Sequence, residues 1–188
     1  MKKIIVLFLF TSMFATAQES SIETNKNEFR VDVFSAIAFG RISLSYERFL
    51  GKNFSVNLNT NFSNSAKIQN EFDGGSRNNL SKYEFNPSIR YALSKGKSSY
   101  YFAEIFASAN GGDYKEIIRA TDENGNGYYT TQITKYADFA LGGGLGYKMY
   151  IKKAYAIEIL VGFGKNLTNT IKSPDIISRV GINLGYRF

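Results

Sequence analysis

The sequence predicts an all-β protein, an eight-stranded antiparallel up-and-down transmembrane β-barrel. Three observations lead to this fold class. Eight segments of roughly ten residues alternate apolar with polar side chains, which is the period of a β-strand. Short and long connections alternate after the first hairpin, as in barrels that cross an outer membrane. The chain contains 13 Tyr and 16 Phe but only two Pro, a composition that favours strands.

The first three segments show the alternation over residues 29–39, 41–50 and 53–63. In each of them, apolar side chains share one parity and Ser, Asn or charged side chains share the other. The apolar positions are Phe29, Val31, Val33, Ile37 and Phe39 in the first, Ile42, Leu44 and Tyr46 in the second, and Phe54, Val56, Leu58 and Phe62 in the third.

The fourth segment, residues 82–93, alternates in the same way, but the fifth, residues 99–108, is ambiguous. Tyr100 and Phe102 there share a parity with Glu104, so hydropathy alone leaves the phase open. We choose the opposite parity as the outward face. The chosen outward residues are Tyr101, Ala103, Ile105 and Ala107.

The last three segments cover residues 133–149, 154–164 and 176–188, and their apolar positions again recur at every second residue. The connections between the segments supply a second signal, because tight turns alternate with longer polar stretches. The short connections are 51–53, 94–98 and 150–153, and the long ones are 64–81, 110–132 and 165–175.

The N-terminus predicts a signal peptide over residues 1–17. The basic pair that begins at Lys2 precedes an apolar run over residues 4–10, which is too short for a transmembrane helix of about 20 residues. The sequence ATA that ends at Ala17 supplies the small residues that a signal peptidase requires. We therefore expect cleavage between Ala17 and Gln18.

This reading predicts three segments in the chain and a location for each. They are the signal peptide over residues 1–17, a periplasmic N-terminal segment over 18–28, and the outer-membrane barrel over 29–188. Because the number of strands is even, both termini are expected in the periplasm and the long connections outside the cell.

Composition narrows the classes of function. Lys and Arg number 23 against 16 Asp and Glu, but the positive charges are scattered in runs of at most two, which argues against nucleic-acid binding. The chain has no Cys, which excludes disulfides and thiolate metal sites. It also has no His, which excludes a Ser–His catalytic dyad.

Alternation alone does not distinguish a transmembrane barrel from a soluble lipocalin-like barrel, which has the same alternation but points its apolar faces inward. The polar parity mixes acids with bases and also carries glycines, as expected of an ion-pair network inside a narrow lumen. Tyrosines near the strand ends on the apolar parity suit a membrane interface. The transmembrane barrel is therefore favoured. Its predicted lumen residues are Arg30, Asp32, Glu47, Glu84, Arg90, Glu104, Lys148, Glu158, Arg179 and Arg187.

The C-terminal sequence VGINLGYRF resembles the signal by which outer-membrane proteins are recognised for insertion. Its apolar and aromatic positions are Leu184, Tyr186 and Phe188. The whole mature chain resembles eight-stranded OmpX/OmpA-type barrels, and GRISLSYERFLGKNFSVNL resembles an uncharacterised outer-membrane β-barrel family of Bacteroidota. The resemblance implies the fold, the location and insertion by the barrel-assembly machinery, rather than an activity.

Two groups of residues outside the predicted lumen raise the question of ligands. Asp122, Asn124 and Asn126 match the start of a calcium loop, but Ile133 stands where its bidentate Glu belongs, so a turn at a hairpin tip is the preferred interpretation. Basic residues in the long connections fit either lipopolysaccharide phosphates or ordinary solvated charge. They are Lys67, Arg77, Lys115, Arg119, Lys165 and Lys172.

A carboxylate-only mechanism through Glu47, Glu84, Glu104 or Glu158 is conceivable, but lumen salt bridges explain these residues better. The sequence thus predicts a monomeric, non-enzymatic outer-membrane barrel with a role in envelope integrity or surface interaction. It needs no cofactor, and its partners are the outer-membrane lipids and lipopolysaccharide. The alternatives are a narrow pore for ions or small solutes and a soluble periplasmic barrel that binds an apolar ligand.

Overall fold

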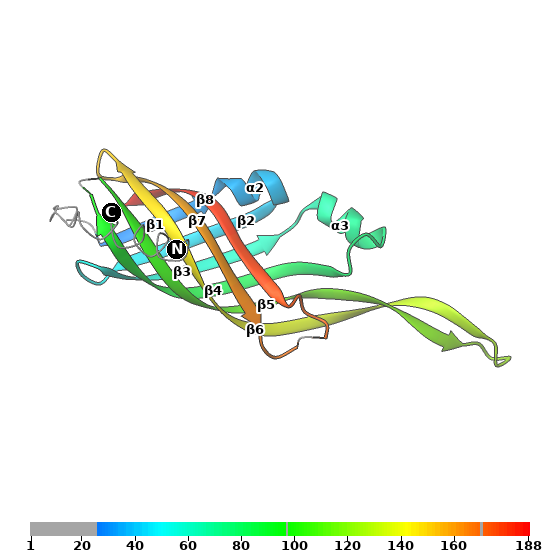
Figure 1. Ribbon diagram of the computed structural model, residues 1–188. Coiled ribbons are helices and arrows are strands. Elements are labelled where there is room, and N and C mark those ends of the chain that lie inside the picture. Colours follow the sequence, from blue (N-terminus) through cyan, green and yellow to red (C-terminus); the bar gives the residue numbers. More distant parts are fainter. Residues whose placement is uncertain (1–25, 97, 170) are drawn as a thin grey trace, which may run out of the picture.

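The computed structural model describes residues 26–96, 98–169 and 171–188, so the predicted signal peptide and its cleavage site lie outside the described residues. The strands form a closed antiparallel barrel in chain order, in which β8 pairs with β1 (Figure 1). The predicted fold class is therefore confirmed. The elements are β1 (Asn27–Asp32), α2 (Val33–Phe39), β2 (Arg41–Phe49), β3 (Phe54–Ser63), α3 (Ala66–Asp73), β4 (Asn79–Lys95), β5 (Ser99–Thr121), β6 (Gly127–Ile151), β7 (Tyr155–Asn166) and β8 (Ile176–Arg187).

The apolar parity of the strands points outward and the polar parity points into the lumen. Ile105 is 74% exposed on the outer wall, whereas Arg30 and Lys148 are fully buried inside. Such an exterior is compatible with hydrocarbon and would be unfavourable in water. The alternative of a soluble barrel whose apolar faces point inward is therefore excluded, because the apolar faces point outward. Within the part of the chain that the structure describes, neither helix is long and apolar enough to cross a membrane.

Both ends of the barrel sequence meet at one end of the barrel, here called the terminal end. The backbone amide of Asn27 donates to the carbonyl of Phe188 at 3.1 Å, and the reverse bond measures 2.8 Å. The short predicted connections also lie at this end. One of them is a tight turn in which Lys152 and Lys153 both have positive φ, the conformation that two-residue hairpin turns require.

Aromatic side chains surround the outer wall near the terminal end. Phe54 packs on Tyr91 with ring centroids 5.0 Å apart, and Tyr101 packs on Tyr147 at 4.9 Å. Tyr186 lies between Tyr155, at 5.6 Å, and Phe188, at 6.4 Å. A belt of this kind is typical of the level at which a barrel meets lipid headgroups.

The predicted first strand, residues 29–39, is wrong in its second half. The strand ends at Asp32, whose carboxylate accepts hydrogen bonds from the Ser35 amide at 3.0 Å and the Ser35 hydroxyl at 2.6 Å and so caps helix α2. Gly40 ends that helix in the left-handed conformation at φ 57°. The residues of α2 were predicted to continue the strand because Val33 and Ile37 have the same odd-numbered parity as the apolar residues of β1.

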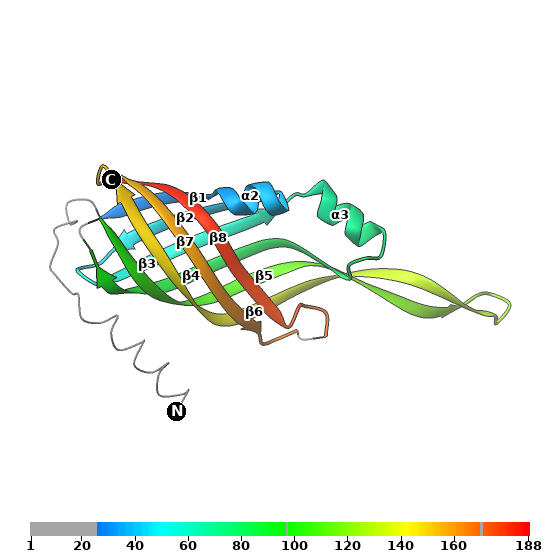
Figure 2. The same cartoon turned by 45° about the horizontal axis from the view of Figure 1, so that its top comes forward.

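The predicted connection over residues 110–132 is also wrong, because most of it is strand. β5 and β6 continue for 23 and 25 residues, and their ends form a long ribbon that leaves the barrel (Figures 1 and 2). β4 accompanies β5 up to Tyr114, and β7 accompanies β6 from Ala140. We call residues 115–133 the projecting hairpin. Together with α2, α3 and residues 167–169 and 171–175, it defines the loop end of the barrel.

Candidate functional site

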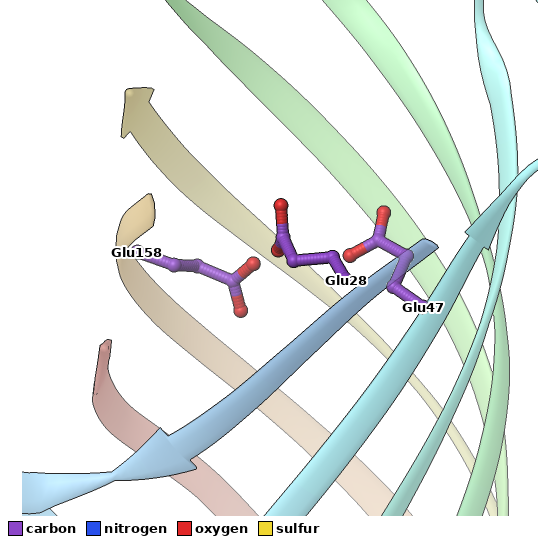
Figure 3. A group of neighbouring side chains, drawn as sticks. All are labelled: Glu28, Glu47 and Glu158. Carbon is purple, nitrogen blue, oxygen red and sulfur yellow. The ribbon is translucent and has the colours of Figure 1, made fainter. Parts of the chain in front are cut away.

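Eight charged side chains fill the middle of the lumen and are here called the central cluster. The antiparallel register creates it, because it places Glu28 opposite Glu47, Arg90 opposite Glu104 and Lys148 opposite Glu158 on inward-facing positions. Figure 3 shows three of its carboxylates turned toward one another. The members are Glu28, Arg30, Glu47, Arg90, Glu104, Lys148, Glu158 and Arg179, all buried.

Lys148 lies at the centre of three carboxylates. Its Nζ is 2.7 Å from Glu28 Oε1, 2.7 Å from Glu47 Oε2 and 3.0 Å from Glu158 Oε2. Oxygens of the three carboxylates approach within 4.8 Å of one another, a spacing that also suits a metal ion. The ammonium group supplies the positive charge that an ion would supply, so this geometry is explained by the chain itself.

Two arginines link these carboxylates to one another and to Glu104. Arg30 donates to Glu28, to Glu47 at 2.5 Å and to Asn57 Oδ1 at 2.6 Å. Arg90 donates to Glu47 at 2.9 Å, to Glu158 at 2.8 Å and to Glu104 at 2.9 Å. Because each carboxylate is shared, the cluster behaves as a single hydrogen-bonded network. With Asn57 from β3, all eight strands contribute to it.

Charge in the central cluster is balanced. Four carboxylates, from Glu28, Glu47, Glu104 and Glu158, face four cations, from Arg30, Arg90, Lys148 and Arg179. Pairing of this kind offsets the cost of removing charges from water. The cluster thus joins the walls of the lumen across its middle.

Aromatic rings lie against two of the arginines of the cluster. Arg90 lies 4.6 Å from the centroid of Phe102, and Arg179 lies 4.6 Å from that of Phe106. These rings point inward, so the outward phase chosen for residues 99–108 agrees with the structure. They fit because the neighbouring strand carries Gly142 and Gly146, where a Cβ atom would collide with the rings.

Three predicted lumen residues lie inside the barrel but outside the central cluster. Asp32 caps α2 and accepts from the Ile182 amide at 3.2 Å. Glu84 pairs with Arg41 at 3.2 Å, nearer the loop end. Arg187 stacks on the ring of Phe49 at 4.1 Å, nearer the terminal end.

Glu28 is the member of the central cluster that sequence reasoning missed. The sequence assigned it to the N-terminal segment, whereas β1 begins at Asn27 and buries Glu28 completely. Its carboxylate also accepts a hydrogen bond from the Tyr150 hydroxyl at 2.7 Å. The sequence does indicate this position, because Glu28 lies two residues before Arg30 and four before Asp32, in the same inward-facing parity.

The lumen also contains a small polar cavity of about 30 Å³ between the central cluster and the loop end. Serines, asparagines and arginines line it, including Ser43, Asn61 and Arg179. A space of this size suits one or two water molecules. It is too small to hold a solute of the size of a sugar.

The calcium-loop residues lie at the tip of the projecting hairpin. The Asp122 carboxylate accepts hydrogen bonds from the Asn124 amide at 3.0 Å and the Asn126 amide at 2.7 Å, so it closes its own turn. Ile133 lies well down the ribbon, opposite Lys115. Calcium binding at the tip remains a prediction.

The predicted loop cations do not form one group. Lys115 donates to the carbonyls of Phe72 and Asp73 and so holds the end of α3 against the hairpin. Arg77 pairs with Glu71 at 3.3 Å. Lys67, Arg119 and Lys165 are exposed, and Lys172 is half-buried. Contact of these residues with lipopolysaccharide remains a prediction.

Asp138 fastens the connection between β7 and β8 at the loop end. Its carboxylate accepts from the Thr168 amide at 2.9 Å, the Thr168 hydroxyl at 2.5 Å and the Asn169 amide at 3.0 Å, and also from the Ser173 hydroxyl. Sequence reasoning did not single out this residue. The sequence feature that could have identified Asp138 is its position among the inward-facing residues of β6.

Comparison with solved structures places the fold among outer-membrane barrels. The N-terminal β-barrel domain of Pseudomonas aeruginosa OprF matches with a TM-score of 0.55 at 10% identity, over 88% of this chain and 98% of that domain. The attachment invasion locus protein Ail of Yersinia pestis gives 0.48 at 9% identity, over 87% and 99% of the two chains. Neisserial surface protein A gives 0.47 at 13% identity, over 86% and 93%.

At these identities the likeness to OprF concerns the fold alone, and it confirms the predicted resemblance to eight-stranded outer-membrane barrels. No curated protein matches the chain in sequence. Residues 3–173 match the family described as protein of unknown function DUF3575, and the chain therefore belongs to that family.

Proposed function

We propose that the protein is a non-enzymatic integral barrel of the cell outer membrane that acts through its outer surface, in envelope integrity or surface interaction. The central cluster carries this proposal. Its four cations and four carboxylates occupy the middle of the lumen and bond to one another, which leaves the wall and the loop end for contacts with other molecules.

The outer surface of the barrel wall has the properties expected of a protein in the outer membrane. The apolar exterior and the aromatic belt suit a lipid bilayer, and the predicted signal peptide and C-terminal insertion signal suit export and assembly. The proposed partners are outer-membrane lipids, lipopolysaccharide and, during insertion, the barrel-assembly machinery. We expect a monomer with both termini in the periplasm and the projecting hairpin outside.

Cell fractionation tests the location. The protein is expected in the outer-membrane fraction, soluble only with detergent, and its folded form should migrate differently on a gel before and after heating. Recovery of a folded form from the soluble periplasmic fraction would overturn the proposal.

The projecting hairpin gives a direct test of action through the surface. Tyr114 and Thr134 are a register pair, so residues 115–133 can be replaced by Asn-Gly, which closes the ribbon with a two-residue turn. The shortened barrel is expected to fold and insert, and cells that carry it are expected to lose the envelope or adhesion phenotype that the full-length gene restores. Equal complementation by both forms would contradict the proposal.

A narrow pore is the second candidate, and the polar cavity of about 30 Å³ beside the central cluster is the observation that favours it. The buried charge pairs oppose conduction, because an ion would have to break them. Planar bilayers with the purified protein are therefore expected to show no reproducible unitary currents, whereas a porin measured in parallel conducts. Stable currents from the wild-type barrel would favour the pore instead.

A further inference from the structure

A depression of about 380 Å³ lies on the outer wall where the projecting hairpin leaves the barrel. β4 ends its pairing here, while β5 and β6 continue outward (Figure 1). The lining combines two lysines, one carboxylate, two tyrosines and small residues. The lining residues are Lys82, Tyr83, Gly112, Asp113, Lys135, Tyr136 and Ala137.

A β-bulge brings Lys82 to this surface. Ser81 pairs with Gly112 and Tyr83 pairs with Gly111, so Lys82 is an extra residue between two ladder pairs. As a result, Lys82 and Tyr83 are both exposed on the outer wall, with 48% of the Lys82 side chain and 45% of Tyr83 accessible. Bulges commonly redirect a side chain toward a binding site.

Two glycines of β5 allow β4 to lie close against it beside the depression. A Cβ atom at Gly112 would collide with the carbonyl of Leu80, and one at Gly111 would collide with the Tyr83 ring. Lys135 lies opposite Asp113 in the register, and Lys82 Nζ is 2.5 Å from the Asp113 carboxylate. The depression therefore contains two lysines and one carboxylate, which is paired with Lys82, and it carries a net positive charge.

The depression is continuous with the apolar wall. The next outward row contains Phe85, Ala109 and Phe139, which pair across β4, β5 and β6. Both phenylalanines are exposed, at 45% and 42%. Lysines at the border of an apolar wall extend toward the polar headgroups and attract anionic lipid.

We propose that this depression binds the phosphate of an anionic lipid from the leaflet that surrounds the loop end. The phosphate lies between Lys82 and Lys135, and the acyl chains of the same lipid lie against Phe85 and Phe139. Because this inference rests on the proposed outer-membrane location, the lipid is the phosphorylated glycolipid of the outer leaflet. Neither lysine belongs to the loop cations that the sequence singled out.

Native mass spectrometry of the detergent-purified full barrel, titrated with bisphosphorylated lipid A, tests the site. The wild-type barrel is expected to retain this lipid and to bind dephosphorylated lipid A more weakly. The double variant Lys82→Gln/Lys135→Gln is expected to bind the phosphorylated lipid at least about tenfold more weakly, because two charge-assisted contacts are lost. The control Lys152→Gln/Lys153→Gln removes the same charge from exposed positions at the terminal end and is expected to bind as the wild type does.

Two further variants separate this site from general attraction by positive charge. Asp113→Asn removes the competing carboxylate and is expected to strengthen binding. Ala137→Leu fills the depression from an exposed position without a change in charge and is expected to weaken binding. Equal retention by the lysine double variant and the wild type, or displacement of the lipid by inorganic phosphate alone, would overturn the inference.

The fold of each variant is checked by its migration on a gel before and after heating. A correctly folded barrel with unchanged lipid retention would contradict this inference alone. Absence of the wild-type protein from the outer-membrane fraction would instead contradict the proposed function.

Discussion

Lys148 Nζ lies 2.7 Å from Glu28 Oε1, although 120 residues separate them along the chain. They belong to β6 and β1, which are not neighbours in the barrel, so the bond crosses the lumen rather than running along the wall. Glu47 of β2 and Glu158 of β7 bind the same ammonium group. One side chain thus joins four strands, and its loss should affect the whole barrel.

Replacing Lys148 with Met keeps the volume and removes the charge. Glu28, Glu47 and Glu158 would then lie within 4.8 Å of one another without the ammonium group. Since breaking a buried ion pair leaves unpaired charge, we expect the free energy of unfolding to fall by about 3–5 kcal/mol. Urea titration of the barrel in lipid vesicles, followed by gel migration, measures it. The control Lys165→Met, at an exposed position, should change little, and equal stability of the two variants would refute the role given to Lys148.

Gly146 faces the lumen, and a Cβ atom there would come within 2.6 Å of Phe102 Cε1. We expect Gly146→Ala to destabilise the barrel by about 1–3 kcal/mol, because overpacking forces the ring to move. Gly143 is the matched control, since its Cβ would meet nothing closer than 3.4 Å. Phe102→Leu in the Gly146→Ala background should recover part of the loss. The same urea titration, applied to the wild type and these three variants, gives the free energies of unfolding, and equal effects at both glycines would contradict this account.

Phe188 closes the barrel through its backbone and carries the predicted assembly signal in its side chain. Its amide and carbonyl both bond to Asn27, whereas its ring is 52% exposed and stacks on Tyr186. We expect deletion of Phe188 to reduce the yield in the outer membrane more than it reduces the stability of the barrel that does insert. Phe188→Ala keeps both backbone bonds, so a similar loss of yield assigns the effect to the ring. Normal membrane yield of the deletion would contradict the prediction.

The tip of the projecting hairpin should respond to acid through Asp122. Hydrogen bonds from the backbone amide of Asn126, and then from its side chain and from the Asn124 amide, lower the pKa of this exposed carboxyl below its ordinary value of 3.8. A lowered pKa in the folded turn means that the ionised carboxylate stabilises the turn at neutral pH. This contribution is lost as the pH falls through the lowered pKa.

An NMR titration of the barrel in micelles measures this response at the Asn124 and Asn126 amides. Both signals should shift with a midpoint below pH 3.8, and Asp122→Asn should abolish the shift. A midpoint at or above that value would show that the carboxylate does not hold the turn. The same signals, or titration calorimetry at millimolar calcium, test the calcium site predicted at Asp122, Asn124 and Asn126.

Several parts of the structure were not predicted, and the physical reason differs from one part to the next. α2 follows from the caps at Asp32 and Gly40, which are weaker signals than the apolar alternation of the same segment. The projecting hairpin forms because β5 and β6 continue to pair with each other as far as Thr121 and Gly127. The Asp, Asn and Gly residues at its tip led to the prediction of a connection over all of 110–132. The bulge at Lys82 is visible as a change of register between two strands.

The sequence by itself determined the number of strands, their order and, outside residues 33–39 and the ambiguous segment 99–108, the face that most strand residues occupy. These properties are local, because the side-chain direction of an extended chain alternates at every residue and a hairpin brings together strands that are adjacent in the chain. The tertiary structure alone decided which charges meet. Lys148 could be assigned to the lumen from its parity, but its bonds to Glu28, Glu47 and Glu158 depend on the closure of the barrel, which brings strands together across a lumen that no local pattern describes.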